Sequence, residues 1–105
     1  MIIIQDIKEK SAKWELTKFG YEVKVSPLKT GDYTLEGLEE VVCIERKRNT
    51  CELAGNLGRK KEQFFNEIDR MQSFKYRYII LEFTLDDVLN FPINSGLPRR
   101  LYSKV

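Results

Sequence analysis

The chain has 105 residues, of which 42% are hydrophobic and 32% charged, and this composition suits one folded, soluble domain. No apolar run approaches the roughly 20 residues that a membrane span requires, and the start lacks signal-peptide character, so we expect an intracellular protein with no membrane association. Two cysteines and no histidine exclude a disulfide framework and argue against structural zinc. The formal net charge of +2 alone says little about partners.

The first half of the chain predicts four strands and one helix. Apolar or alternating runs bounded by turn residues indicate strands over residues 2–5, 21–28, 31–35 and 40–47. The last two runs predict a β-hairpin with its turn near residues 37–39. Between the first two runs, residues 11–19 predict a helix that begins at Ser11 and ends at Gly20.

The second half predicts helices around one strong strand. Asn49 is the expected N-cap of a helical region, with Glu52 as its capping-box partner, and Gly58 predicts a break into two helices. The nearly continuous apolar run 76–83 predicts a central strand covered on both faces. A short helix is expected from Thr84, and loop over most of residues 91–105.

This order of elements favours one α/β domain over residues 1–105, in which helices flank a mixed sheet. The last residues look like the start of a helix, so we expect a domain cut short at its C-terminus. Side-chain alternation along the fourth strand places Val42 and Ile44 toward the core. The aromatic residues Trp14, Phe19 and Tyr21 are also expected in the core.

The predicted hairpin brings acidic and basic side chains together. If its turn centres on residues 38 and 39, Asp32 and Glu45 lie opposite each other, roughly 5 Å apart. Cys43, Glu45 and Lys47 lie on the opposite face of this strand from Val42 and Ile44. Two carboxylates suit Mg²⁺, which activates water and neutralises phosphoryl charge, and a lysine can stabilise charge that develops in the transition state. The alternative is a surface cluster of cross-strand salt bridges.

The sequence around these residues resembles a known signature. Gly31-Asp32-Tyr33, followed by a hydrophobic strand into Ile44-Glu45-Arg46-Lys47, resembles the GD…ERK pattern of the XPF-type structure-specific nucleases. These form a branch of the PD-(D/E)xK, restriction-endonuclease-like superfamily. The resemblance covers roughly residues 2–83. Weaker matches in that span are the opening IIIQDIKE, Arg59, Phe64, Glu67 and residues 79–82.

The resemblance implies a restriction-endonuclease-like mixed sheet with flanking helices and a divalent ion, Mg²⁺ or Mn²⁺. Asp32, Glu45 and the backbone carbonyl of Arg46 would bind the metal. Lys47 would be the catalytic lysine, and the Arg46 side chain would contact phosphate or the acidic cluster. The supporting acids would be Asp6, Glu9 and Glu52, although a helix-capping role for Glu52 is equally open.

Positive charge is concentrated in one part of the chain. Residues 45–61 hold six basic residues against two acidic ones, which would attract phosphates if they lie on one face. The expected DNA contacts are Lys8, Arg48, Arg59, Lys60 and Lys61, and a solvated helix surface is the alternative. Two positions depart from the family pattern. Lys8 stands where the family has an arginine and loses its bidentate fork, and Cys51 stands where it usually has an aspartate.

The resemblance therefore predicts a metal-dependent DNA endonuclease that hydrolyses phosphodiester bonds in flapped or branched DNA. The expected setting is repair, recombination or phage DNA processing. One alternative is another branch of the superfamily, such as a junction resolvase. A second alternative is a catalytically silent nuclease-like domain that binds DNA or a partner. A homodimer or a partner subunit is also expected, with the apolar residues 79–93 as the candidate surface.

Overall fold

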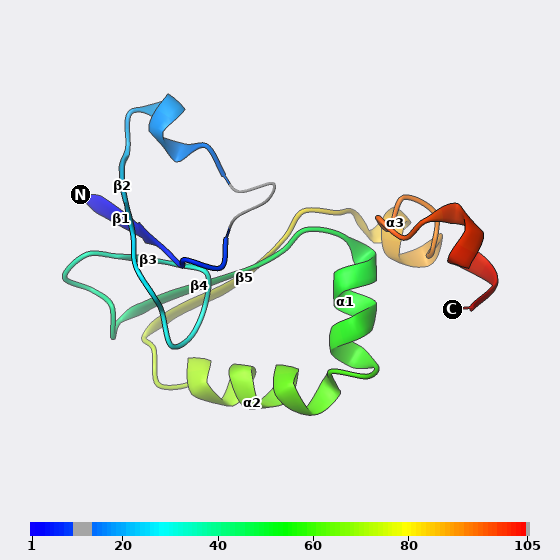
Figure 1. Cartoon of the computed structure of the whole chain (residues 1–105). Helices are drawn as coiled ribbons and strands as arrows, with labels where there is room; N and C mark the ends of the chain where they lie inside the picture. The colour runs from blue at the N-terminus through cyan, green and yellow to red at the C-terminus, as the bar shows by residue number, and fades with distance from the viewer. Residues whose placement is uncertain (10–13, 105) are drawn as a thin grey trace. The chain divides into compact units, whose positions relative to one another are not determined.

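The computed structural model describes residues 1–9 and 14–104 and contains five strands and three α-helices (Figure 1). The strands are β1 (Ile2–Gln5), β2 (Glu22–Val25), β3 (Tyr33–Leu35), β4 (Val42–Lys47) and β5 (Tyr76–Leu81). The helices are α1 (Thr50–Leu57), α2 (Lys61–Met71) and α3 (Leu85–Leu89), with 3₁₀ turns η1 (Leu16–Phe19) and η2 (Arg99–Lys104). The predicted mixed α/β architecture is therefore confirmed.

One sheet connects the five strands in the order β2-β1-β3-β4-β5. β1 pairs with β2 in parallel and with β3 in antiparallel orientation, and β3 pairs antiparallel with β4 through Tyr33 and Ile44. The Tyr76 N–H donates to the Val41 carbonyl and the Glu82 N–H to the Lys47 carbonyl, both at 2.9 Å. These two bonds advance by the same number of residues on both strands, so β5 runs parallel to β4.

The chain divides into two compact units. The first unit contains Met1–Glu45 and Glu67–Ile79, and the second contains Arg46–Asn66 and Ile80–Val105. β4 and β5 therefore each begin in the first unit and end in the second. The expectation of one nuclease domain over residues 1–105 stays a prediction.

In the first unit, the segment after residue 13 differs from the expected helix over residues 11–19. Ser11 and its neighbours lie outside the described residues, and within the described part only η1 is helical. The Trp14 N–H donates to the Tyr33 hydroxyl at 3.3 Å, so a side chain on β3 takes the donor that a helix would use. Gly20 ends the turn as predicted, with a left-handed φ of 85°.

The core of the first unit also departs from the expected pattern on β4. Cys43 is 1% exposed and Glu45 7%, whereas Ile44, expected to face the core, is only half-buried. Phe19 and Tyr21 were expected in the core and are 77% and 50% exposed. The expected core positions of Ile44, Phe19 and Tyr21 are therefore wrong, and on β4 the buried face is the one that carries Cys43 and Glu45.

The second unit contains α1, which follows the end of β4. The Asn49 side chain accepts the Glu52 N–H at 2.9 Å, which confirms Asn49 as the N-cap. Gly58 lies between α1 and α2, so the predicted break is also confirmed. Thr84 and Asp87 form a complete capping box at the start of α3.

The loop after α3 packs onto the start of α1 within the second unit. Ser95 is fully buried, and its carbonyl accepts the Cys51 N–H at 3.2 Å. Gly96 has a φ of +87°, and a Cβ there would lie 2.7 Å from the Asn49 side-chain nitrogen. Only glycine fits this contact without displacing the helix cap.

β5 was expected to be a central strand covered on both faces, and this expectation is wrong. The strand lies at the end of the sheet order, and all six of its residues are exposed. A sheet edge has one strand neighbour instead of two, so an apolar sequence does not by itself place a strand in the centre. Among the described residues, no helix combines the length and hydrophobicity needed to cross a membrane.

Candidate active site

The hairpin of β3 and β4 places the two predicted metal ligands opposite each other in the first unit. Tyr33 pairs with Ile44, so the next positions in this antiparallel register are Asp32 and Glu45. The Asp32 N–H donates to the Ile44 carbonyl at 2.8 Å, which continues the ladder by one residue. The predicted hairpin register is therefore confirmed.

Gly31 lets the chain turn into this hairpin at close range. Its φ is +82°, and a Cβ would lie 2.7 Å from the Cys43 sulfur and 3.1 Å from the Ile44 carbonyl oxygen. Residues with a side chain rarely adopt this backbone conformation, and other atoms already fill the space that a Cβ would need. The Gly-Asp dipeptide therefore positions Asp32 directly beside β4.

Carboxylates surround the Cys43 thiol, which lies between them on β4. Burial, together with the negative charges of Glu45, Glu67 and Asp32, raises the pKa of Cys43 to about 11. Glu67, on α2, matched the family without a predicted role, and its Oε1 is buried without a hydrogen-bond partner among the described residues. Glu67 follows the buried Phe64 by three positions, so the two residues share one face of α2. This spacing is the sequence signal that could have found Glu67.

In the second unit, Arg46 and Lys47 are both 4% exposed. The Arg46 guanidinium forms an ion pair with Glu82 through Nε, and its Nη2 donates to the Glu82 Oε2 at 3.2 Å. The Lys47 ammonium lies 4.9 Å from the centre of the Phe64 ring. The Arg46 side chain thus contacts a carboxylate at the end of β5, outside the set of acids expected to bind metal.

The predicted supporting acids occupy different surroundings. The Asp6 N–H donates to the Asp32 carbonyl at 2.8 Å, and its carboxylate accepts the N–H of Leu28 at 2.9 Å and of Lys8 at 3.4 Å. The Glu9 carboxylate instead accepts the Tyr33 hydroxyl at 3.3 Å. Asp6 therefore supports the backbone of Asp32, whereas Glu9 contacts Tyr33, the residue after Asp32.

The third supporting acid, Glu52, belongs to the start of α1. Its carboxylate lies 3.1 Å from the Arg48 guanidinium, and its backbone N–H is the one that Asn49 caps. Arg48 is thus an exposed residue with an acidic neighbour. The remaining predicted DNA contacts, Lys8, Arg59, Lys60 and Lys61, are all exposed.

The side chains at the hairpin offer few ligands for a metal. The described residues contain no group of three or more His, Cys, Asp or Glu side chains that could hold an ion. Asp32 and Glu45 supply two hard oxygen donors at paired positions, which suits Mg²⁺ or Mn²⁺, since these ions keep several water or substrate ligands. The donor set therefore fits a catalytic divalent ion better than a closed structural site.

The fold is a mixed α/β sheet that pairs Asp32 with Glu45 across the hairpin of β3 and β4. The ERCC4 domain model matches residues 5–96, so the chain belongs to the ERCC4 domain family. No curated protein matches the sequence significantly. The predicted relationship to XPF-type nuclease domains is confirmed by this match.

A solved structure has the same fold. XPF from Aeropyrum pernix aligns with a TM-score of 0.65 and 21% sequence identity over 95% of this chain. The alignment spans 41% of that protein, so the chain is similar to less than half of its length. The likeness confirms the expected fold.

Proposed function

We propose that this chain is a divalent-metal-dependent DNA endonuclease domain that hydrolyses phosphodiester bonds. The observation that carries the proposal is the hairpin register, which sets Asp32 opposite Glu45. Lys47 follows two positions after Glu45 on β4, so alternation gives both side chains the same face of the strand. Membership of the ERCC4 domain family supports the same chemistry.

Asp32 and Glu45 would hold Mg²⁺ or Mn²⁺, with the Arg46 backbone carbonyl as a further ligand. The ion, when bound, supplies Lewis-acid stabilisation of the phosphoryl oxygens. The Lys47 ammonium would orient the attacking water and stabilise charge on the phosphate as it develops. Because Lys47 is 4% exposed, its charge is little screened by solvent.

Neighbouring residues would hold these groups in place. The Asp6 backbone fixes the peptide of Asp32 through its 2.8 Å hydrogen bond. Glu82 holds the Arg46 guanidinium near the end of β4. Arg46 would therefore stabilise the position of β4 and would not contact phosphate. Preorganisation of this kind reduces the cost of reaching the transition state.

DNA would bind through the exposed basic residues Lys8, Arg48, Arg59, Lys60 and Lys61. The proposed substrates are flapped or branched DNA, with products that carry 5′-phosphate and 3′-hydroxyl ends. Repair, recombination or phage DNA processing would use such cuts. A junction-resolving activity on the same site residues is the competing substrate preference.

A second copy or a partner subunit would cover the exposed apolar residues around α3. Leu85 and Leu89 are each 72% exposed and Ile93 is 55% exposed. Large apolar side chains gathered on one short stretch are typical of an interaction surface. We propose this stretch as the dimer or partner contact.

The test is cleavage of labelled flap, splayed-arm, four-way-junction and linear duplex DNA with Mg²⁺, Mn²⁺ or EDTA. Asp32→Asn and Lys47→Ala should each lower the cleavage rate by at least about 100-fold. Glu36→Gln and Lys75→Ala change exposed residues of the same kinds and should leave the rate unchanged.

The substrate ranking then separates flap cleavage from junction resolution. Retarded DNA mobility without cutting in either metal, by a protein with a cooperative unfolding transition, would contradict the proposal. That result would identify a catalytically silent domain that binds DNA.

A further inference from the structure

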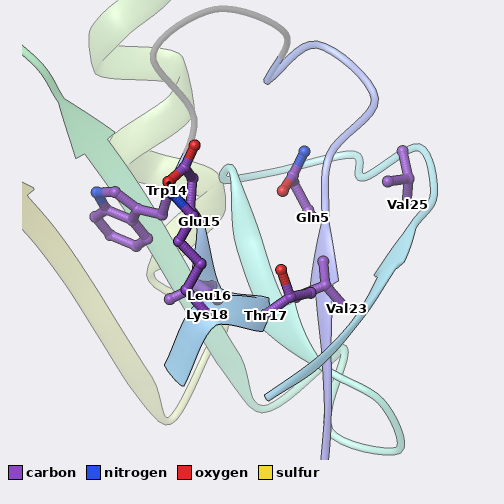
Figure 2. A pocket seen from close by; sticks show the side chains of 8 residues that line it. All are labelled: Gln5, Trp14, Glu15, Leu16, Thr17, Lys18, Val23 and Val25. Carbon is purple, nitrogen blue, oxygen red and sulfur yellow. Dashed lines mark ion pairs between the residues drawn. The ribbon is translucent and has the colours of Figure 1, made fainter. Parts of the chain in front are cut away.

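A second concave site lies in the first unit between η1 and the strands β1 and β2. Its cavity volume is about 380 Å³, which falls at the lower end of the range typical of small-ligand pockets. Figure 2 shows Gln5 and Val23 on one side and Trp14 and Leu16 across from them. Apolar and polar groups thus alternate around this pocket, unlike a gap in a hydrophobic core.

A buried amide forms one wall of the pocket. Gln5 is 4% exposed, and its Nε2 donates to the Glu9 carbonyl at 3.1 Å, which fixes the orientation of the side chain. An amide offers both donor and acceptor atoms in one plane. Thr17, which also lines the pocket, adds a hydroxyl at the exposed side. Fixed groups of this kind recognise the edge of a flat, polar ring.

Trp14, another lining residue, carries an indole that is already held in place. The Trp14 ring stacks on the Tyr33 ring with centroids 4.6 Å apart and planes 18° apart. The Tyr33 hydroxyl accepts the Trp14 backbone N–H and donates to Glu9. Because the ring is fixed before any ligand arrives, little conformational entropy would be lost on stacking.

The pocket adjoins the segment that supports Asp32, the proposed metal ligand. Gln5 directly precedes Asp6, whose N–H donates to the Asp32 carbonyl. Lys18, at the rim, is ion-paired with Glu15 and 71% exposed, so its ammonium remains accessible to a phosphate. A basic group beside an aromatic ring is a combination typical of sites that bind single-stranded nucleic acid.

We propose that this pocket binds one unpaired nucleobase of single-stranded DNA, with the base lodged against Trp14 and its edge at Gln5 and Thr17. The proposal deepens the proposed function, since branched and flapped DNA contain unpaired bases next to a duplex. It assigns a binding role to residues outside the acidic hairpin.

Trp14 is the only tryptophan in the chain, so tryptophan fluorescence reports on the surroundings of this one residue. The experiment titrates the full chain with an oligothymidylate in EDTA, where no cleavage occurs, and repeats it with an equally long oligomer of abasic residues. We expect the thymidylate to quench Trp14 emission and to bind roughly tenfold more tightly than the abasic oligomer.

Two variants and one control locate the effect. Gln5→Leu and Thr17→Val should each weaken thymidylate binding at least about threefold and leave abasic binding unchanged. Phe19→Ala removes an aromatic ring from the same turn, outside the pocket, and should leave both affinities unchanged. Thr17 is exposed, so its variant tests the site even if Gln5→Leu fails to fold.

Equal quenching by both oligomers would overturn the proposal, as would DNA binding, seen by anisotropy of a labelled oligomer, that leaves Trp14 emission unchanged. Cleavage with Mg²⁺ is measured separately. Active protein whose Trp14 does not respond would contradict only the base pocket, and a responding protein without cleavage would contradict only the nuclease assignment.

Discussion

β4 and β5 contrast sharply, although each has six residues. β4 reads VCIERK, and five of its six residues are buried, including Glu45, Arg46 and Lys47. β5 reads YRYIIL, and all six residues are exposed. The charged strand is thus inside and the apolar strand outside, the reverse of what hydropathy indicates.

The difference teaches that burial follows a strand's place in the sheet and the partners of its side chains. Charged groups on β4 are buried beside partners, such as Glu82 for Arg46, which reduce the cost of removing them from water. β5 follows last in the sheet order and therefore keeps a free edge among the described residues. Apolar residues at such an edge suit contact with another molecule.

The largest expected difference in unfolding free energy comes from introducing a carboxylate on β4 and, for comparison, on β5. Cys43→Asp would add a buried charge beside three carboxylates and should cost more than about 4 kcal/mol of unfolding free energy. Ile80→Asp, on β5, should cost less than about 1 kcal/mol, because Ile80 is 38% exposed. Urea unfolding measures both. An equally large loss for Ile80→Asp would show that β5 is covered in solution, and sedimentation would reveal whether a second copy covers it.

A smaller effect should follow from removing the carboxylate that holds Arg46. Glu82→Ala should lower the unfolding free energy by about 2–3 kcal/mol, between an exposed pair and a buried one, since the Glu82 side chain is 32% exposed. Glu36→Ala, which breaks the exposed pair with Lys24, should cost less than about 1 kcal/mol. Equal losses in the two variants would contradict the positioning role of Glu82.

A third expected effect concerns the two thiols. Cys43 is 1% exposed, and its pKa rises from the ordinary 9.0 to about 11, so at pH 8 Cys51 should react with a thiol reagent at least about 100-fold faster. The folded state favours the protonated Cys43. This stabilisation is complete below about pH 9 and is lost as pH rises toward 11.

The pH dependence has its own control. Cys43→Ala should flatten the fall in unfolding free energy between pH 9 and 11, whereas Cys51→Ala should leave it unchanged. Comparable labelling of Cys43 and Cys51 in the folded protein would contradict the burial of β4.

Local signals predicted much of this fold. Gly20, Gly58 and the caps at Asn49 and Thr84 ended or began elements where expected, because they satisfy backbone groups through neighbouring residues. The hairpin register also followed from the expected position of its turn, near residues 37–39, which fixes the pairing of Asp32 and Glu45.

Features that depend on distant residues were not predictable in the same way. The helix expected over residues 11–19 ignores the Tyr33 hydroxyl, which lies 19 positions from the Trp14 N–H that it accepts. The exposure of β5 depends on strand order, and the Arg46–Glu82 ion pair spans 36 positions. Residue patterns along one segment carry no information on such contacts. The metal-binding, catalytic and DNA-binding roles of the site residues stay predictions.

The contact between Gly96 and Asn49 sets a limit on how far the chain can be shortened or fused. Ser95 and Gly96 close over the cap of α1, so a chain that ends before them would expose the cap and release the Cys51 N–H. Tags or fused domains are therefore better attached beyond the η2 turn. A library of C-terminal truncations should lose solubility abruptly at this dipeptide rather than gradually along the tail.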